Sequence, residues 1–104
     1  MHAVVGTVTI SDFEHARRLL HDDVLPTITE VPGFVSGYWL APVDGKGTSL
    51  LIFETEDEAH AMADQMPPGR QLNQFVTVDS VEVREVAGSV HQLDDVPLQV
   101  TPES

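Results

Sequence analysis

The alternation of hydrophobic and polar positions predicts a strand followed by a long helix at the start of the chain. Residues 3–10 alternate with a period of two, which is typical of a strand. Apolar side chains then recur every three or four residues, which predicts a helix with one core-facing stripe. The stripe consists of Phe13, Ala16, Leu20, Val24, Ile28 and Val31. Ser11 and Glu14 have the spacing of a capping box, and Pro26 predicts a kink or a break in this helix.

The middle of the chain predicts two strands joined as a hairpin. The sequence Val31-Pro32-Gly33 ends the first helix, and residues 34–41 then alternate as a strand. A loop with two glycines at 42–47 suits a hairpin connection. The next strand, 48–54, contains an unbroken apolar run, so we expect both of its faces to be buried.

The last part of the predicted domain holds a second helix and a long strand. A capping box at Thr55–Glu58 begins the helix, whose apolar stripe is rich in alanine, and Pro67-Pro68-Gly69 ends it. Residues 70–74 are predicted to be a polar connector. The strand that follows, 75–87, changes its apolar phase near Asp79 and Ser80, which predicts a β-bulge.

The order β-α-β-β-α-β predicts an α+β, ferredoxin-like fold with a four-stranded antiparallel sheet and two helices on one face. Strands 3–10 and 48–54 lack a charged face, so the side away from the helices must also be covered. A second copy of the chain is the economical cover, which predicts a homodimer that forms a dimeric α/β barrel. We expect this domain to span 1–87, with an acidic tail at 88–104 docked on the domain or on the partner subunit.

Composition narrows the possible partners. The 104 residues indicate one domain, and 17 acidic against 5 basic residues give a formal charge of −12. This charge opposes binding to nucleic acid or to an anionic membrane surface. Cysteine is absent, which excludes disulfides, thiolate nucleophiles and cysteine-ligated zinc. Without a long apolar run or a signal-peptide pattern at the start, we expect no membrane segment and a cytoplasmic protein.

Candidate chemistry is sparse in this sequence. It has no glycine-rich phosphate loop, no His-Glu-x-x-His pair and no nucleophile elbow. His15 and His60 are candidates for a general base, although a solvated helix surface also explains His60. Arg70 is a candidate for holding a substrate carboxylate. The run His21-Asp22-Asp23 is interpreted as solvated charge, so neither a metal nor a cofactor is predicted.

Tyr38 and Trp39 are adjacent on a predicted strand and therefore face opposite sides of the sheet. Aromatic residues on a sheet usually pack in the core or at an interface, and we interpret both in this way. The alternative is that one of them forms a wall that stacks on a flat ligand, so both are candidates for ligand binding.

Two stretches resemble the dimeric α/β-barrel superfamily, in particular antibiotic biosynthesis monooxygenase-like domains. They are Val31-Pro-Gly-Phe-Val-Ser-Gly37 and Leu51-Ile-Phe-Glu-Thr-Glu-Asp-Glu-Ala59. The resemblance implies a cavity between the sheet and its two helices, lined in several members by a Trp and by an Asn from the first strand. It also implies a haem-binding His on the second helix of haem-degrading members. This chain departs from that pattern, because Asn73 lies in the connector and the first strand offers Thr7 and Thr9.

Three hypotheses about function follow. The first is a small-molecule-binding barrel for an apolar or aromatic ligand that acts as a cofactor-independent monooxygenase on an aromatic or polyketide-like substrate. The second is a barrel that binds ligands or assembles without catalysis. The third is a haem-binding or haem-degrading protein.

Overall fold

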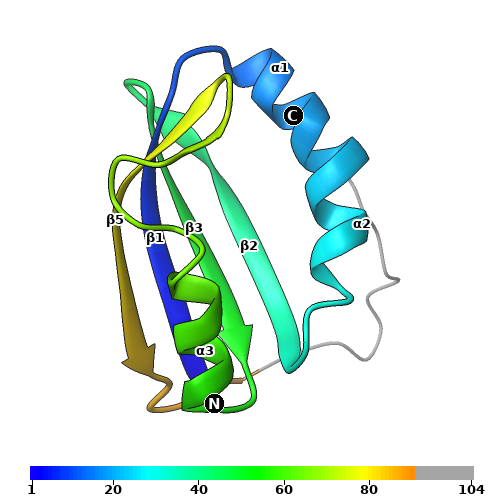
Figure 1. Cartoon of the computed structure of the whole chain (residues 1–104), viewed down its shortest axis with the longest axis vertical. Helices are drawn as coiled ribbons and strands as arrows, with labels where there is room; N and C mark the ends of the chain where they lie inside the picture. Colours follow the sequence, from blue (N-terminus) through cyan, green and yellow to red (C-terminus); the bar gives the residue numbers. More distant parts are fainter. Residues whose placement is uncertain (91–104) are drawn as a thin grey trace.

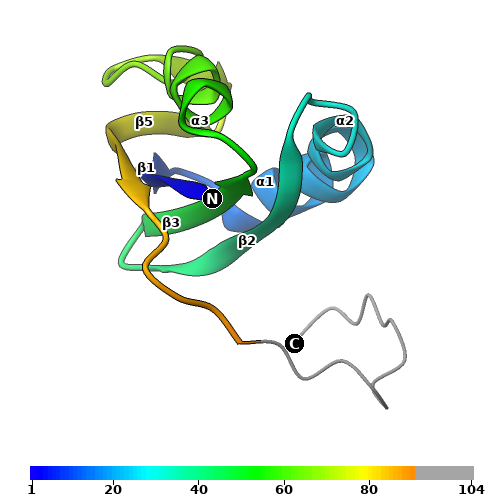
Figure 2. The same ribbon diagram turned by 90° about the horizontal axis from the view of Figure 1, so that it is seen from below.

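The computed structural model describes residues 1–90, which form one antiparallel sheet with the helices on one of its faces (Figures 1 and 2). The strands are β1 His2–Ile10, β2 Phe34–Val43, β3 Lys46–Phe53, β4 Gln71–Asn73 and β5 Val76–Glu85. The helical segments are α1 Phe13–Leu19, the π-helical turn η1 Leu20–Val24, α2 Leu25–Ile28 and α3 Glu56–Ala63. The order β2-β3-β1-β5-β4 places β1 at the centre of the sheet, and the predicted α+β class is confirmed.

The sheet has five strands, so the prediction of four was wrong. The extra strand, β4, lies within 70–74, where the sequence predicts a polar connector. It pairs with β5, with Asn73 opposite Val76, and the Arg70 carbonyl accepts a 2.8 Å hydrogen bond from the Val78 amide. Backbone hydrogen bonds hold this short polar strand, and a pattern of side-chain hydrophobicity does not reveal them.

The predicted bulge in the last strand is confirmed. Thr7 of β1 lies opposite Ser80, whereas Val8 lies opposite Val78, so Asp79 is the extra residue on β5. The bulge changes which residues of β5 face the helices and explains the phase change in the sequence.

The β2–β3 hairpin is tighter than predicted. Val43 pairs with Lys46, so the connection contains Asp44 and Gly45 alone. Both have positive φ, 53° and 78°, as a type I′ turn requires. The expected loop at 42–47 is therefore mostly strand.

The first helical segment begins at Asp12, one residue later than the predicted cap at Ser11. The Asp12 carboxylate accepts a 3.2 Å hydrogen bond from the His15 amide. The predicted interruption near Pro26 takes the form of η1, where the Leu25 amide donates to the Leu20 carbonyl. Proline lacks an amide hydrogen, so the helix cannot continue its regular hydrogen bonds through this point.

The core lies between α3 and the middle of the sheet. Val4, Phe53 and Val78 are fully buried there, and Ala59 brings α3 close to the strands. The predicted capping box is present at the start of α3. The Thr55 hydroxyl accepts from the Glu58 amide at 3.1 Å, and the Glu58 carboxylate accepts from the Thr55 amide at 3.2 Å.

The opposite side of the sheet, here called the outer face, carries no helix (Figure 2). Val5, Leu50 and Tyr38 are cross-strand neighbours on this face, and Tyr38 is 55% exposed. β3 is buried on one face alone in the single chain, so its predicted burial on both faces depends on a covering partner. No helix within residues 1–90 is long and apolar enough to cross a membrane. The predicted docking of the tail falls, beyond residue 90, outside the described residues.

Candidate functional site

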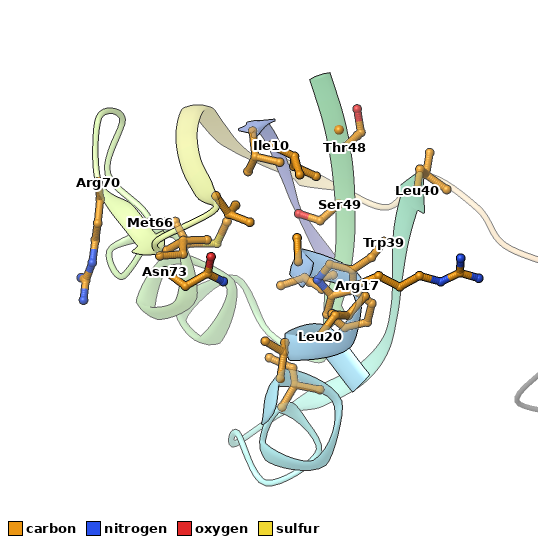
Figure 3. A pocket seen from close by; sticks show the side chains of 18 of the residues that line it. Ile10, Arg17, Leu20, Trp39, Leu40, Thr48, Ser49, Met66, Arg70 and Asn73 are labelled. Carbon is orange, nitrogen blue, oxygen red and sulfur yellow. The ribbon is translucent and has the colours of Figure 1, made fainter. Parts of the chain in front are cut away.

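A cavity of about 400 Å³ lies between the sheet and the helical segment α1–η1–α2. Its wall includes residues of β1, β2 and β3, of the helical segment, of α3 and of β4 (Figure 3). Most of the wall is apolar. Its polar members are Arg17, Thr48, Ser49, Gln65, Arg70 and Asn73. A largely apolar hollow with a few polar groups is the usual form of a small-molecule site.

The helical wall consists of the apolar stripe that the sequence predicts as the core face. Phe13, Ala16, Leu20, Val24 and Ile28 all line the cavity. Ala16 and Ile28 are buried, whereas Phe13 is 38% exposed. The stripe therefore faces a hollow over much of its length and does not pack fully on the sheet.

The π-helical turn keeps this stripe in line. From Ala16 to Ile28 its members are four residues apart, and in a regular α-helix four residues overshoot one turn by roughly 40°. The π-helical turn at Leu20–Val24 contains more residues per turn than an α-helix, which reduces the angle by which successive stripe residues rotate away from the cavity. Leu20 and Val24 consequently both face the cavity.

Trp39 forms the wall on β2. It projects toward the helices and packs against the core, while its neighbour Tyr38 lies on the outer face. The indole lies across Gly37, where an added Cβ would come within 2.9 Å of Trp39 Cη2. Gly37 thus leaves room for the indole to lie on the strand. Gly33, the turn residue before β2, has φ of +80°, and a Cβ there would overlap the Glu58 carboxylate.

Among the uncharged polar side chains of the wall, Ser49 from β3 and Asn73 from β4 point into the cavity (Figure 3). Ser49 is 7% exposed, and no hydrogen bond joins its hydroxyl to another residue within 1–90. Asn73 Oδ1 accepts a 2.8 Å hydrogen bond from the Phe75 amide.

The two arginines of the wall, Arg17 and Arg70, border the cavity with their aliphatic carbons and not with their charged groups. Arg70 Nη1 donates to the Gln65 carbonyl at 3.2 Å, which ties it to the turn that follows α3. The Arg17 guanidinium lies 5.6 Å from the centre of the Phe13 ring. Both guanidinium groups point away from the cavity in Figure 3. The described part of the cavity wall also contains no Asp, Glu or His, so its interior carries no charge.

The predicted histidine candidates lie outside the cavity. His15 Nδ1 donates to Asp12 Oδ2 at 2.7 Å, and its ring stacks on Phe75 with centroids 5.2 Å apart. This hydrogen bond is the main reason why the pKa of Asp12 lies below its ordinary value. His60 lies on α3, with Nε2 3.4 Å from Glu56 Oε2. Within residues 1–90 no cluster of His, Asp or Glu is arranged to hold a metal ion.

The structure brings together residues that the sequence did not connect. Of the predicted ligand-binding candidates, Trp39 and Arg70 line the cavity, and Tyr38 lies on the outer face. The sequence predicts a connector at Asn73, whereas the structure places this residue in β4 and on the cavity wall together with Trp39 (Figure 3). Ser49 could have been found from alternation along its strand, because Leu51 and Phe53 share its face and make a lone hydroxyl there unusual.

No model of a known protein family and no curated protein sequence matches the chain. Among the solved structures that are similar to it are two of one haem degrader and one of a second protein. A haem degrader, MhuD from Mycobacterium tuberculosis with two haems bound in its active site, is 20% identical with a TM-score of 0.62 over 88% of this chain and 100% of that one. HapK from Hahella chejuensis is 11% identical with a TM-score of 0.62 over 88% and 98%.

An arginine-to-serine variant of MhuD with two manganese protoporphyrin IX molecules bound per active site is 20% identical, with a TM-score of 0.61 over 88% and 100%. At these identities the likeness establishes the fold. The expected fold is confirmed at that level, because the chain shares the ferredoxin-like α+β fold of these neighbours.

Proposed function

We propose that the protein binds a flat, apolar small molecule of the aromatic or polyketide-like class between α1–η1–α2 and the sheet. The observation that carries this proposal is the cavity of about 400 Å³, with an indole on one wall and an apolar helical stripe on the other. Trp39 offers an aromatic face on which a planar ligand can stack. The uncharged interior favours a ligand with no net charge at its buried end.

A fluorescent aromatic amine tests this proposal. Trp39 is the only tryptophan in the chain, so energy transfer from it to bound N-phenyl-1-naphthylamine reports occupancy close to the cavity wall. Val24→Phe fills the cavity and should weaken binding about tenfold. Val43→Phe makes the same change at a residue 73% exposed beyond the cavity and should leave binding unchanged. Equal affinities for both variants would contradict the proposed site.

Cofactor-independent oxygenation is the catalytic form of this proposal. In this reaction a methylene group of the substrate reacts with one O₂. One oxygen atom becomes a carbonyl on the substrate, and the other leaves as water with the two methylene hydrogens. The Ser49 hydroxyl and the Asn73 Nδ2 amide support it, because hydrogen-bond donors aimed at a developing enolate oxygen favour loss of the methylene proton. The described wall offers no carboxylate or imidazole as a base, so the substrate must be acidic by itself. Oxygen uptake with anthrone measures this reaction, and uptake equal to the protein-free rate would leave binding without turnover.

Haem is the alternative ligand, since the fold resembles that of a haem degrader with haem in its active site. The residues present do not fit a histidine-ligated haem. His60, on the helix for which the resemblance implies a haem-binding His, lies beside Glu56 outside the cavity. The softest donors on the wall are the thioethers of Met62 and Met66. In a hemin titration, we therefore expect the same Soret band for His60→Ala as for the unmodified protein. Loss of the Soret band in His60→Ala would assign His60 as the haem ligand.

We further propose that the protein is a homodimer joined through the outer face. Val5, Leu50 and Tyr38 form an apolar row across three strands that nothing within residues 1–90 covers. Leu50→Asp places a charge in this row and should give monomers in sedimentation at micromolar concentration. Val43→Asp, at a residue 73% exposed at the β2–β3 hairpin, is the matched control. A monomeric unmodified chain would contradict the proposed dimer.

A further inference from the structure

We infer that Ser49 and Asn73 form a pair of hydrogen-bond donors that selects ligands with a carbonyl oxygen, such as aromatic ketones and quinones. This inference rests on the proposed function, because it specifies which flat apolar molecules the cavity accepts. The two side chains come from different strands, β3 and β4, and both point into the hollow (Figure 3).

The orientation of Asn73 follows from its partner. The Phe75 backbone amide can only donate, so the side-chain atom 2.8 Å from it must be the acceptor, Oδ1. The Nδ2 group at the other end keeps both hydrogens free of partners within residues 1–90. Asn73 therefore presents a donor to the cavity.

Ser49 presents the second donor. The residue is 7% exposed, and its hydroxyl has no hydrogen-bond partner within residues 1–90, although buried hydroxyls are generally hydrogen-bonded. Ser49 lies opposite Gly6, where an added Cβ would come within 3.1 Å of both Ser49 Oγ and Met66 Cε. The glycine thus keeps the space beside the hydroxyl open, and an acceptor on the ligand would satisfy it.

The rest of the wall favours a neutral acceptor over an acid. The guanidinium groups of Arg17 and Arg70 point away from the hollow, so a buried carboxylate would lack a countercharge. The described lining has no Asp, Glu or His, so a ligand that only donates hydrogen bonds would find few strong acceptors. A carbonyl oxygen, which accepts and carries no full charge, matches both conditions.

A pair of bicyclic probes separates recognition of the carbonyl from apolar binding. 1-Tetralone and tetralin share one skeleton and differ in a carbonyl against a methylene, and amide chemical shifts in NMR titrations give the affinity for each. Asn73→Asp retains an acceptor for the Phe75 amide but removes the donor. Ser49→Ala removes the hydroxyl, and Tyr38→Phe, on the outer face, is the control.

The ratio of tetralone affinity to tetralin affinity should fall about tenfold in Asn73→Asp and about fivefold in Ser49→Ala, while Tyr38→Phe leaves it unchanged. A ratio that stays within twofold in both variants, with both probes still bound, would overturn the donor pair and leave cavity binding intact. Absence of saturable binding of either probe to the unmodified protein would overturn the proposed function together with this inference.

Discussion

The two helical regions of the protein lie on the same face of the sheet and do different things there. α3 packs directly on β1, β3 and β5, with Ala59 fully buried at the contact. Within the described residues, α1, η1 and α2 make no comparably close packing on the strands. The cavity lies between them and the sheet instead (Figure 3). α3 therefore forms part of the hydrophobic core, whereas α1–η1–α2 forms one wall of the cavity.

The difference begins in the residues that face the sheet. The stripe of α3 is rich in alanine, which allows a helix to approach a sheet closely. The first segment instead presents larger side chains such as Phe13, Leu20 and Val24 around a π-helical turn. Turns of this kind are frequent at functional sites. Large side chains four residues apart, together with the π-helical turn, thus form a cavity wall in the first helical segment and do not pack closely on the sheet.

The same substitution in the two helices gives the largest contrast. Ala59→Leu adds three carbons where packing is complete and should lower the free energy of unfolding by about 1–3 kcal/mol. Ala16→Leu makes the identical change at a buried alanine that borders the cavity, so we expect about 0.5 kcal/mol or less. Urea unfolding followed by circular dichroism measures both. Equal losses would show that the first helix packs as tightly as α3.

For ligand binding, we expect the larger effect from Ala16→Leu and the smaller effect from Ala59→Leu. Ala16→Leu projects into the cavity and should weaken binding of N-phenyl-1-naphthylamine, whereas folded Ala59→Leu protein should retain it. Unchanged affinity in Ala16→Leu would separate α1 from the binding site.

Most of the fold could be predicted because it depends on patterns of side chains. The strand at residues 3–10, the cap at Thr55 and the bulge at Asp79 each leave a local signal in the sequence, and each is found in the structure. The short strand β4 leaves no such signal, because backbone pairing with β5 holds it in place. The predicted cap, Ser11, lies one residue before the observed cap, Asp12, because serine and aspartate are both favourable at this position.

The site was harder to predict, because its parts are distant in sequence. The helical stripe was found, but hydrophobic periodicity cannot distinguish a surface packed on a core from one that borders a cavity. Asn73 reaches the cavity only because β4 pairs with β5. Trp39 was interpreted as a packing residue, and the structure places it both against the core and on the cavity wall.

The helix caps give a smaller contrast in stability. Thr55→Ala removes the hydroxyl that accepts from the Glu58 amide and should cost about 1 kcal/mol in urea unfolding. Thr55→Ser keeps the acceptor and should cost clearly less. Similar losses for the two variants would mean that the methyl group, and not the hydrogen bond, accounts for the effect.

Pro26→Ala tests whether the π-helical turn holds the cavity wall. The substitution restores an amide hydrogen and permits regular α-helical bonds through this segment. Leu20 and Val24 would then rotate relative to the cavity, so we expect affinity for N-phenyl-1-naphthylamine to fall about threefold with little change in stability. Pro32→Ala, outside the helical segment, is the control. Unchanged affinity would show that the turn does not depend on the proline.

The smallest expected effect concerns the start of α1, where Asp12 pairs with His15. The hydrogen bond from the His15 ring is the largest cause of the lowered pKa of Asp12, followed by the bond from the His15 amide. A carboxyl whose pKa is lowered on folding stabilises the fold above its unfolded pKa of about 3.9, and this contribution is lost as the pH falls through the lower folded value. NMR titration of the Asp12 carboxyl carbon measures the shift. In His15→Ala the pKa should rise toward its ordinary value, and an unmoved pKa would assign the shift to the backbone cap alone.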